Sequence, residues 1–308
     1  MVRVAAVQAG SIAFDTPATL RKLERLVAEA AERDADLVVF PEAFVGGYPK
    51  GHDFGAVVGS RTEEGRDWFR RYWESAINLP GHESERIGAA ATEHGVHLVV
   101  GVIERDGGTL YCTAVFFGPD GVMLGTHRKL MPTAAERLIW GFGDGSTMPV
   151  IETSVGRLGA AICWENYLPL YRAALYAKGV QIWCAPTVDD RERWAASMQH
   201  IAVEGRCFVV SVGQYTTRAD YPDDYPIEAG PDQVLIGGGS CVVDPHGRFL
   251  VEPDRKGEAV LVTDIDLGEI PRATFDLDVV GHYARPDVFR LIVNEEPQQP
   301  VSFDGFQE

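Results

Sequence analysis

Three side chains with reactive groups stand where apolar segments end. The run 158–162 (LGAAI) leads into Cys163, the run 37–40 (LVVF) leads through a proline to Glu42, and MLGTHR leads to Lys129. Catalytic groups gather at strand ends in α/β folds, because the strands fix position and the adjoining loops leave room for a ligand. A thiolate is a strong nucleophile, a carboxylate accepts its proton, and an ammonium group stabilises the anion formed on attack. Together these residue types predict covalent catalysis by a thiol.

Each of these residues also has an ordinary structural interpretation. A cysteine beside a tryptophan often only packs, a glutamate after a strand often caps the next turn, and a lone lysine is usually exposed. Taken together, the three structural interpretations are less plausible than each is alone. Three polar groups flanked by apolar residues must pair with one another, because burial of an unpaired charge is costly.

Composition restricts the class of protein. The chain has 308 residues, of which 45% are hydrophobic and 24% charged, and its formal net charge is −17. This balance disfavours nucleic acid and anionic membrane surfaces as partners. No apolar run reaches the roughly 18 residues of a membrane span, and the N-terminal segment lacks the pattern of a signal peptide, so we expect a cytoplasmic protein. Five widely spaced cysteines without a CxxC pair make a disulfide framework or a zinc site improbable.

Short β-branched runs alternate with longer amphipathic segments along the chain. The pattern predicts about a dozen strands, five or six helices and several β-hairpins, including one at GPDG (118–121). Such a mixture favours an α/β fold whose sheets are partly parallel and partly antiparallel, with helices on their outer faces. We expect one domain over 1–275, an irregular C-terminal tail over 276–308, and a long Pro- and Asp-rich loop over 217–236.

Three longer blocks resemble the signature regions of a known family. FPEAFVGGYPKG (40–51), HRKLMPTAAERLIWGFGDGS (127–146) and CWENYLPL (163–170) are similar to the three motifs of the nitrilase superfamily of carbon–nitrogen hydrolases. The resemblance implies a four-layer α-β-β-α sandwich with two mixed sheets, and neither a metal nor an organic cofactor. It also implies a Glu–Lys–Cys triad formed by Glu42, Lys129 and Cys163. A second active-site glutamate matches Glu136, which would orient the lysine and the substrate but, taken alone, reads as a carboxylate at a helix start.

The residues after the nucleophile, CWEN, resemble the branch that hydrolyses nitriles to carboxylic acids and ammonia. Alternatives that use the same triad are an amidase, an N-carbamoyl amidohydrolase and a cyanide-hydrolysing enzyme. A non-catalytic interaction protein and a thiol redox sensor are alternatives of other classes. Candidate pocket walls are Tyr48, Trp140, Trp164 and Pro186 with the residues that follow it; large aromatic walls would favour apolar nitriles.

The resemblance also implies assembly. Family members pair through the helices that follow the nucleophile and the next strand, here 167–179 and 190–205, and both segments are apolar on more than one face. We therefore expect a homodimer, which could extend into larger spirals, and a C-terminal tail that docks on a partner subunit.

Overall fold

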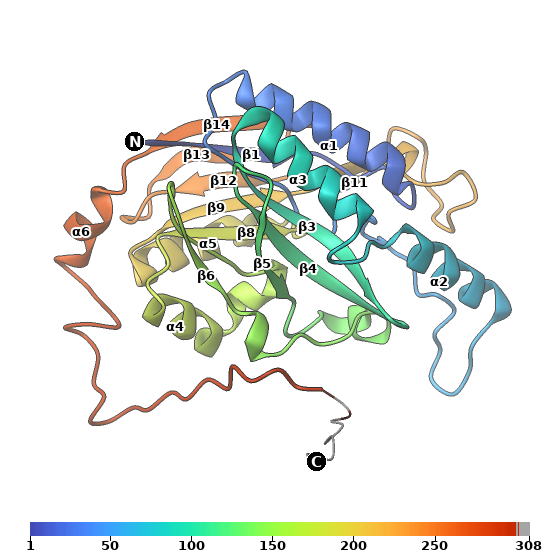
Figure 1. Ribbon diagram of the computed structural model, residues 1–308. Coiled ribbons are helices and arrows are strands. Elements are labelled where there is room, and N and C mark those ends of the chain that lie inside the picture. Colours follow the sequence, from blue (N-terminus) through green and yellow to red (C-terminus); the bar gives the residue numbers. More distant parts are fainter. Residues whose placement is uncertain (300, 302–308) are drawn as a thin grey trace, which may run out of the picture.

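Two six-stranded mixed sheets form the centre of the molecule (Figure 1). The computed structural model describes residues 1–299 and 301. The first sheet has the order β14-β1-β2-β3-β4-β5, in which β1, β2 and β3 are parallel and the outer pairings are antiparallel. Its strands are β1 (Val2–Gln8), β2 (Leu37–Val39), β3 (His97–Asp106), β4 (Thr109–Phe117), β5 (Met123–Arg128) and β14 (Ala259–Ile265).

The second sheet repeats this arrangement in the order β13-β12-β9-β8-β7-β6, with β7, β8 and β9 parallel. Its strands are β6 (Val150–Thr153), β7 (Gly156–Ala160), β8 (Ile182–Thr187), β9 (Phe208–Gly213), β12 (Ser240–Val243) and β13 (Phe249–Asp254). The expected mixed sheets and hairpins are confirmed, including the turn 118–121 between β4 and β5.

Helices cover the outer face of each sheet, which gives the expected α-β-β-α sandwich (Figure 1). The first sheet packs against α1 and α3, and the second packs against α4 and α5. The α-helices are α1 (Thr16–Ala31), α2 (Glu63–Ser75), α3 (His82–His94), α4 (Pro169–Ala177), α5 (Glu192–Gly205) and α6 (Glu269–Thr274). Short 3-10 helices are η1 (Ala134–Leu138), η2 (Gly145–Thr147), η3 (Cys163–Tyr167) and η4 (Arg218–Asp220).

The layers follow from the twofold alternation of side chains along the central strands. In β8, Ile182 and Cys184 belong to the core between the two sheets, whereas Trp183 and Ala185 face α4 and α5. Both faces of the strand are therefore buried, which explains its continuous apolar sequence.

The topology brings the ends of distant strands to common edges. Because β4 is antiparallel to both β3 and β5, β5 runs in the same direction as β2. The segments that carry Glu42 and Lys129 consequently leave the first sheet at the same edge. Parallel pairing of β7 with β8 does the same for the segments that follow them in the second sheet.

The segment 217–236 is more ordered than the expected long loop. Its ends form an antiparallel ribbon of β10 (Tyr215–Thr217) and β11 (Val234–Gly237), and only the part between them lacks strands. The strand-like ends were hidden by the high Pro and Asp content of the segment. From the end of α6 to residue 299 the chain forms neither helix nor strand, and it runs along the lower side of the molecule in Figure 1.

Part of this tail contacts its own chain. Lys178 forms an ion pair with Glu295, and the backbone N–H of Gln298 donates to Asp144 Oδ2 at 2.7 Å.

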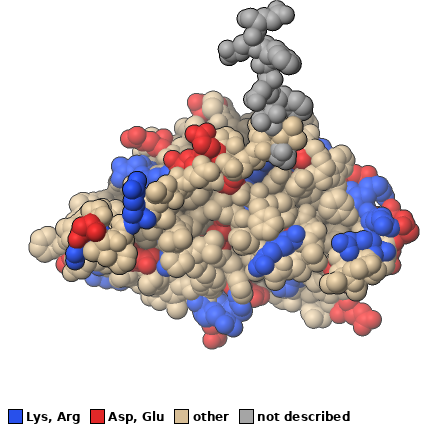
Figure 2. Space-filling model, turned by 90° about the horizontal axis from the view of Figure 1, so that it is seen from below, with Lys and Arg blue, Asp and Glu red and all other residues tan. Residues whose placement is uncertain are grey.

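On the face seen from below, basic and acidic side chains are interspersed among neutral ones, so this face presents no field of a single sign (Figure 2).

Candidate active site

Cys163 begins η3, three residues after β7 ends, and its side chain is buried. Its backbone has φ +52°, a left-handed conformation that non-glycine residues rarely adopt. Strained conformations of this kind persist where the surrounding structure over-determines them, often at functional sites.

Glu42 is fully buried beyond the end of β2, and one of its carboxylate oxygens is occupied by two donors. Oε1 accepts a hydrogen bond from Lys129 Nζ at 2.6 Å and one from Cys112 Sγ at 3.6 Å. Oε2 has no hydrogen-bond partner within the described part of the chain. Gln214 holds the backbone, because its Nε2 donates to the Glu42 carbonyl at 2.7 Å. The carboxylate thus keeps one oxygen available for a proton.

Lys129 lies between two carboxylates. Besides Glu42, its Nζ donates to Glu136 Oε2 at 2.8 Å, and its side chain is inaccessible to solvent. Glu136 is itself held by Tyr48, whose hydroxyl donates to Oε1 at 2.9 Å, and by the Thr133 N–H, which donates to Oε2 at 2.6 Å. A buried ammonium group flanked by two acceptors is well paired, as the high cost of burying a lone charge requires.

Burial and these charges shift the ionisation of the cluster. Burial raises the pKa of the Glu42 carboxyl to about 7, although the Lys129 ammonium opposes the shift. Burial and the Glu42 carboxylate raise the pKa of the Cys163 thiol. Burial alone would lower the pKa of Lys129, but Glu42 and Cys163 raise it well above its ordinary value. At neutral pH the lysine is therefore charged, the resting thiol is protonated, and the Glu42 carboxyl is close to half ionised.

We call Glu42, Lys129, Glu136 and Cys163 the thiol cluster. The structure brings together all four residues that the sequence analysis selected, since Lys129 joins the two glutamates and Glu136 lines the same pocket as Cys163. A nucleophile, a base with one free oxygen and a buried cation in one place can support covalent attack on a polar multiple bond.

A pocket of about 240 Å³ opens beside Cys163. Three of the four residues proposed as pocket walls line either this pocket or an adjoining hollow. Tyr48 and Trp164 line this pocket, and Tyr48 with Trp140 lines an adjoining hollow of about 490 Å³. Pro186 lies buried within β8, paired with Val212, and it is the following Val188 and Asp189 that line the pocket.

Trp164 is held at the pocket mouth by its polar neighbours. Its Nε1 donates to Asp189 Oδ2 at 2.9 Å, and the Arg191 guanidinium lies 4.9 Å from the centre of its ring. Arg191 also forms an ion pair with Asp189. The indole is therefore a fixed wall, although it is 41% exposed.

The sequence analysis selected neither Glu165 nor its buried partner His127. Glu165 accepts hydrogen bonds from the N–H groups of Leu130 (2.6 Å) and Ile162 (2.8 Å), and lies 2.9 Å from His127 Nε2. Burial would lower the pKa of His127, but Glu165 raises it. The Glu165 carboxylate therefore bridges Leu130, which follows Lys129, and Ile162, which precedes Cys163. The only sequence signal was the position of Glu165 three residues after Ile162, as in a capping box.

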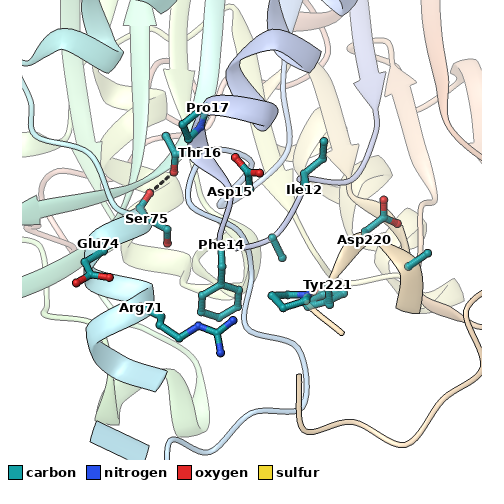
Figure 3. Close-up of a pocket in the computed structure, with 13 residues that line it drawn as sticks. Ile12, Phe14, Asp15, Thr16, Pro17, Arg71, Glu74, Ser75, Asp220 and Tyr221 are labelled. Carbon is teal, nitrogen blue, oxygen red and sulfur yellow. Dashed lines mark hydrogen bonds between the residues drawn. The ribbon is translucent and has the colours of Figure 1, made fainter. Parts of the chain in front are cut away.

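A separate hollow of about 470 Å³ lies between the start of α1, the end of α2 and the segment 219–222 (Figure 3). None of the residues that line it belongs to the thiol cluster. Its polar side chains are engaged within the fold: the Thr16 hydroxyl donates to the Ser75 carbonyl, and Arg71 pairs with Asp224.

Among the described residues, none of the helices has both the length and the apolar character that a membrane span requires.

Comparisons with known proteins place this geometry in context. The sequence profile of the carbon–nitrogen hydrolase family matches residues 3–274. A bifunctional nitrilase/nitrile hydratase of Lupinus angustifolius is 58% identical over 98% of this chain and 88% of its own. An aliphatic nitrilase of Sinorhizobium fredii (strain HH103) is 57% identical over 97% of each chain. Among solved structures, a carbon–nitrogen hydrolase from Helicobacter pylori G27 shares the fold, with a TM-score of 0.73, 22% identity and coverage of 94% of this chain and 96% of that one.

Proposed function

The chain belongs to the carbon–nitrogen hydrolase family and hydrolyses organic nitriles to the carboxylic acid and ammonia, and we propose that the thiol cluster carries out this reaction. The observation that supports the proposal is the placement of Glu42. One of its oxygens is bonded to Lys129, and the other is unoccupied within the described chain while Cys163 lies beside the carboxyl.

In the first step Glu42 accepts the thiol proton as Cys163 Sγ attacks the nitrile carbon. The new C–S bond forms at the expense of one C–N π bond, and the proton passes to the nitrogen, which gives a thioimidate. Lys129 stabilises the negative charge that develops during attack. Because burial disfavours a free thiolate, proton transfer and attack occur together rather than from a resting thiolate.

In the following steps water adds to the thioimidate carbon with Glu42 as the base. Loss of ammonia from the tetrahedral species gives a thioester, and a second water releases the acid and restores the thiol. If the tetrahedral species expels the thiol instead, the product is the amide. A minor hydratase activity is therefore part of the proposal, and the name of the Lupinus angustifolius relative describes both activities.

Glu136 has a positioning role in this scheme. It holds Lys129 from the side opposite Glu42 and is itself held by Tyr48, a pocket wall. Tyr48, Trp140, Trp164 and the residues Val188 and Asp189, which follow Pro186, form the substrate-binding walls in our proposal, and the aromatic faces among them favour apolar nitriles.

The decisive experiment measures ammonia release from aromatic, arylacetic and aliphatic nitriles, with a matching amide as the comparison substrate. We expect turnover of nitriles well above that of the amide. Cys163→Ala should abolish turnover while leaving the circular dichroism spectrum and the melting temperature close to those of the parent. Persistent nitrile turnover in a folded Cys163→Ala protein would contradict the covalent route.

We also propose that the chain forms a homodimer, which could extend into a spiral, and that 1–275 is the catalytic domain while the tail 276–308 docks on a partner subunit. Exposed apolar side chains around α4 support an interface there: Tyr167, Leu168 and Leu170 are 36%, 36% and 69% exposed. In the described part of the tail, Phe289 and Ile292 are 77% and 73% exposed, which supports docking of the tail on a partner subunit. The expected cytoplasmic location stays a prediction.

A further inference from the structure

Thr187 is the last residue of β8, and its hydroxyl contacts the sulfur of Cys163. The distance from Oγ1 to Sγ is 3.2 Å, and the threonine is 1% exposed. Sequence reasoning did not select this residue. Parallel pairing of β7 with β8 explains the contact, because Ala160 pairs with Cys184 and three further residues along each strand lead to Cys163 and Thr187.

The remaining hydrogen bond of Thr187 fixes the direction of its proton. A threonine hydroxyl has one hydrogen and two acceptor positions. The backbone N–H of Asp189 donates to Oγ1 at 2.9 Å, so one acceptor position is filled. Within the described chain, Cys163 Sγ is the acceptor toward which the hydroxyl is directed. The hydroxyl is thus set as a donor to sulfur before any substrate binds.

We propose that Thr187 is a further catalytic residue, whose hydroxyl donates a hydrogen bond to Cys163 Sγ and stabilises the negative charge on sulfur. The inference rests on the proposed function in that Cys163 is the nucleophile. Charge develops on sulfur twice, as the thiol proton moves to Glu42 and again when the thiol leaves the acyl intermediate. A donor already oriented toward an anion strengthens as charge grows, which lowers the barrier without reorganisation.

Lys129 does not already supply the hydrogen bond to sulfur that Thr187 makes. Within the described chain, Lys129 Nζ donates to carboxylate oxygens of Glu42 and Glu136, at 2.6 and 2.8 Å, and not to sulfur. The Thr187 hydroxyl, in contrast, donates to Cys163 Sγ. Loss of a hydrogen bond to a charged group lowers a rate or an equilibrium by roughly 10- to 100-fold.

The test compares Thr187→Val, which keeps the shape and removes the hydroxyl, with Thr187→Ser, which restores it. The readouts are kcat and KM for a nitrile, and the rate of alkylation of Cys163 by iodoacetamide from about pH 6 to pH 10, followed by mass spectrometry of the peptide that contains it. We expect Thr187→Val to move the alkylation profile to higher pH and to lower kcat by roughly 10- to 100-fold with a smaller change in KM. Thr187→Ser should restore most of the parent's alkylation profile and most of its kcat.

Ser211→Ala is the matched control. It removes a buried hydroxyl from β9, the neighbouring strand, where Ser211 Oγ accepts from Trp194 Nε1 at 2.8 Å and, within the described residues, makes no hydrogen bond to Cys163 Sγ. The control should lose stability without a shift in the alkylation profile. If Thr187→Val does not fold, Thr187→Ala carries the same comparison without placing a methyl group against the Asp189 N–H.

A folded Thr187 variant without the hydroxyl that alkylates at the parent's rate at every pH of this range overturns the proposal. Alkylation requires no nitrile, so this result is separable from failure of the proposed function. The latter would appear as nitrile turnover that survives Cys163→Ala.

Discussion

At the scale of single residues, Cys163 unites three properties that seldom occur together. It is buried, it has a positive φ, and it lies beside a carboxylate of which one oxygen has no hydrogen-bond partner among the described residues. The left-handed turn directs its backbone away from the strand at the point where η3 begins. A thiol on the corner between a strand and a helix can therefore face a cavity while its backbone remains fixed by the sheet.

The pH dependence of the reaction should report the ionisation of Glu42. Only the ionised carboxylate accepts the thiol proton, and burial raises its pKa to about 7. The kcat/KM for a neutral nitrile should therefore fall as the pH is lowered through about 7, tenfold per pH unit well below it, instead of falling near 4 to 5 as for an exposed glutamate. Initial rates in a constant-ionic-strength buffer series test this. An acid limb near pH 4.5 would contradict the assignment of Glu42 as the base.

At the scale of elements, backbone contacts position the cluster as much as side chains do. Glu165 links the loop after β5 to the corner before Cys163 through two backbone N–H groups. The segment between β10 and β11 supports the pocket from outside, because Tyr221 and Tyr225 donate to the carbonyls of Tyr48 and Lys50 at 3.0 and 2.9 Å. The region 217–236 thus buttresses a pocket wall.

Gly101 in β3 permits the close approach of the segment that carries Glu42. A Cβ at this position would lie 2.2 Å from the Pro41 carbonyl oxygen and 2.8 Å from Glu42 Cα. Gly101→Ala should therefore displace Glu42, lower the free energy of unfolding by about 1–3 kcal/mol and lower kcat by about 100-fold. Denaturant titration and nitrile kinetics measure the two effects.

Gly108→Ala is the control for this prediction, since a Cβ there meets nothing within 4 Å. It should leave both quantities near those of the parent. Parent-like kinetics in Gly101→Ala would mean that the backbone of β3 does not determine the position of Glu42.

At the scale of the whole molecule, the two sheets contribute complementary parts of the site. Glu42 and Lys129 follow strands of the first sheet, and Cys163 and Thr187 belong to the second. Packing of the two sheets therefore completes the cluster, with a shared apolar core between them. Catalysis should consequently be lost when the two sheets separate.

The proposed interface around α4 can be tested with Leu170→Asp. Leu170 is 69% exposed in the first turn of α4, where a carboxylate interacts favourably with the helix dipole, so the substitution is compatible with folding. We expect the parent to sediment as a dimer or larger assembly at micromolar concentration and Leu170→Asp to shift toward the monomer. Val122→Asp, which changes an exposed residue of the β4–β5 turn, serves as the control. A monomeric parent would refute the proposed assembly.

The sequence by itself determined the layered fold and the identity of the thiol cluster. Short continuous runs of apolar, β-branched residues marked the buried strands, and polar residues directly after such strands had to be paired, which singled out Glu42, Lys129 and Cys163. These inferences depend on local patterns and on the cost of burying charge, and both can be read from a single chain. The motif that resembles the nitrilase signature added Glu136.

Only the tertiary structure decided how the cluster is supported. The pairing of Glu165 with His127, the hydroxyl of Thr187 on sulfur and the ribbon of β10 with β11 join residues through sheet register and packing between sheets. Such contacts depend on which strands become neighbours and on their alignment. No local periodicity encodes that alignment, because it is set by the packing of the whole chain.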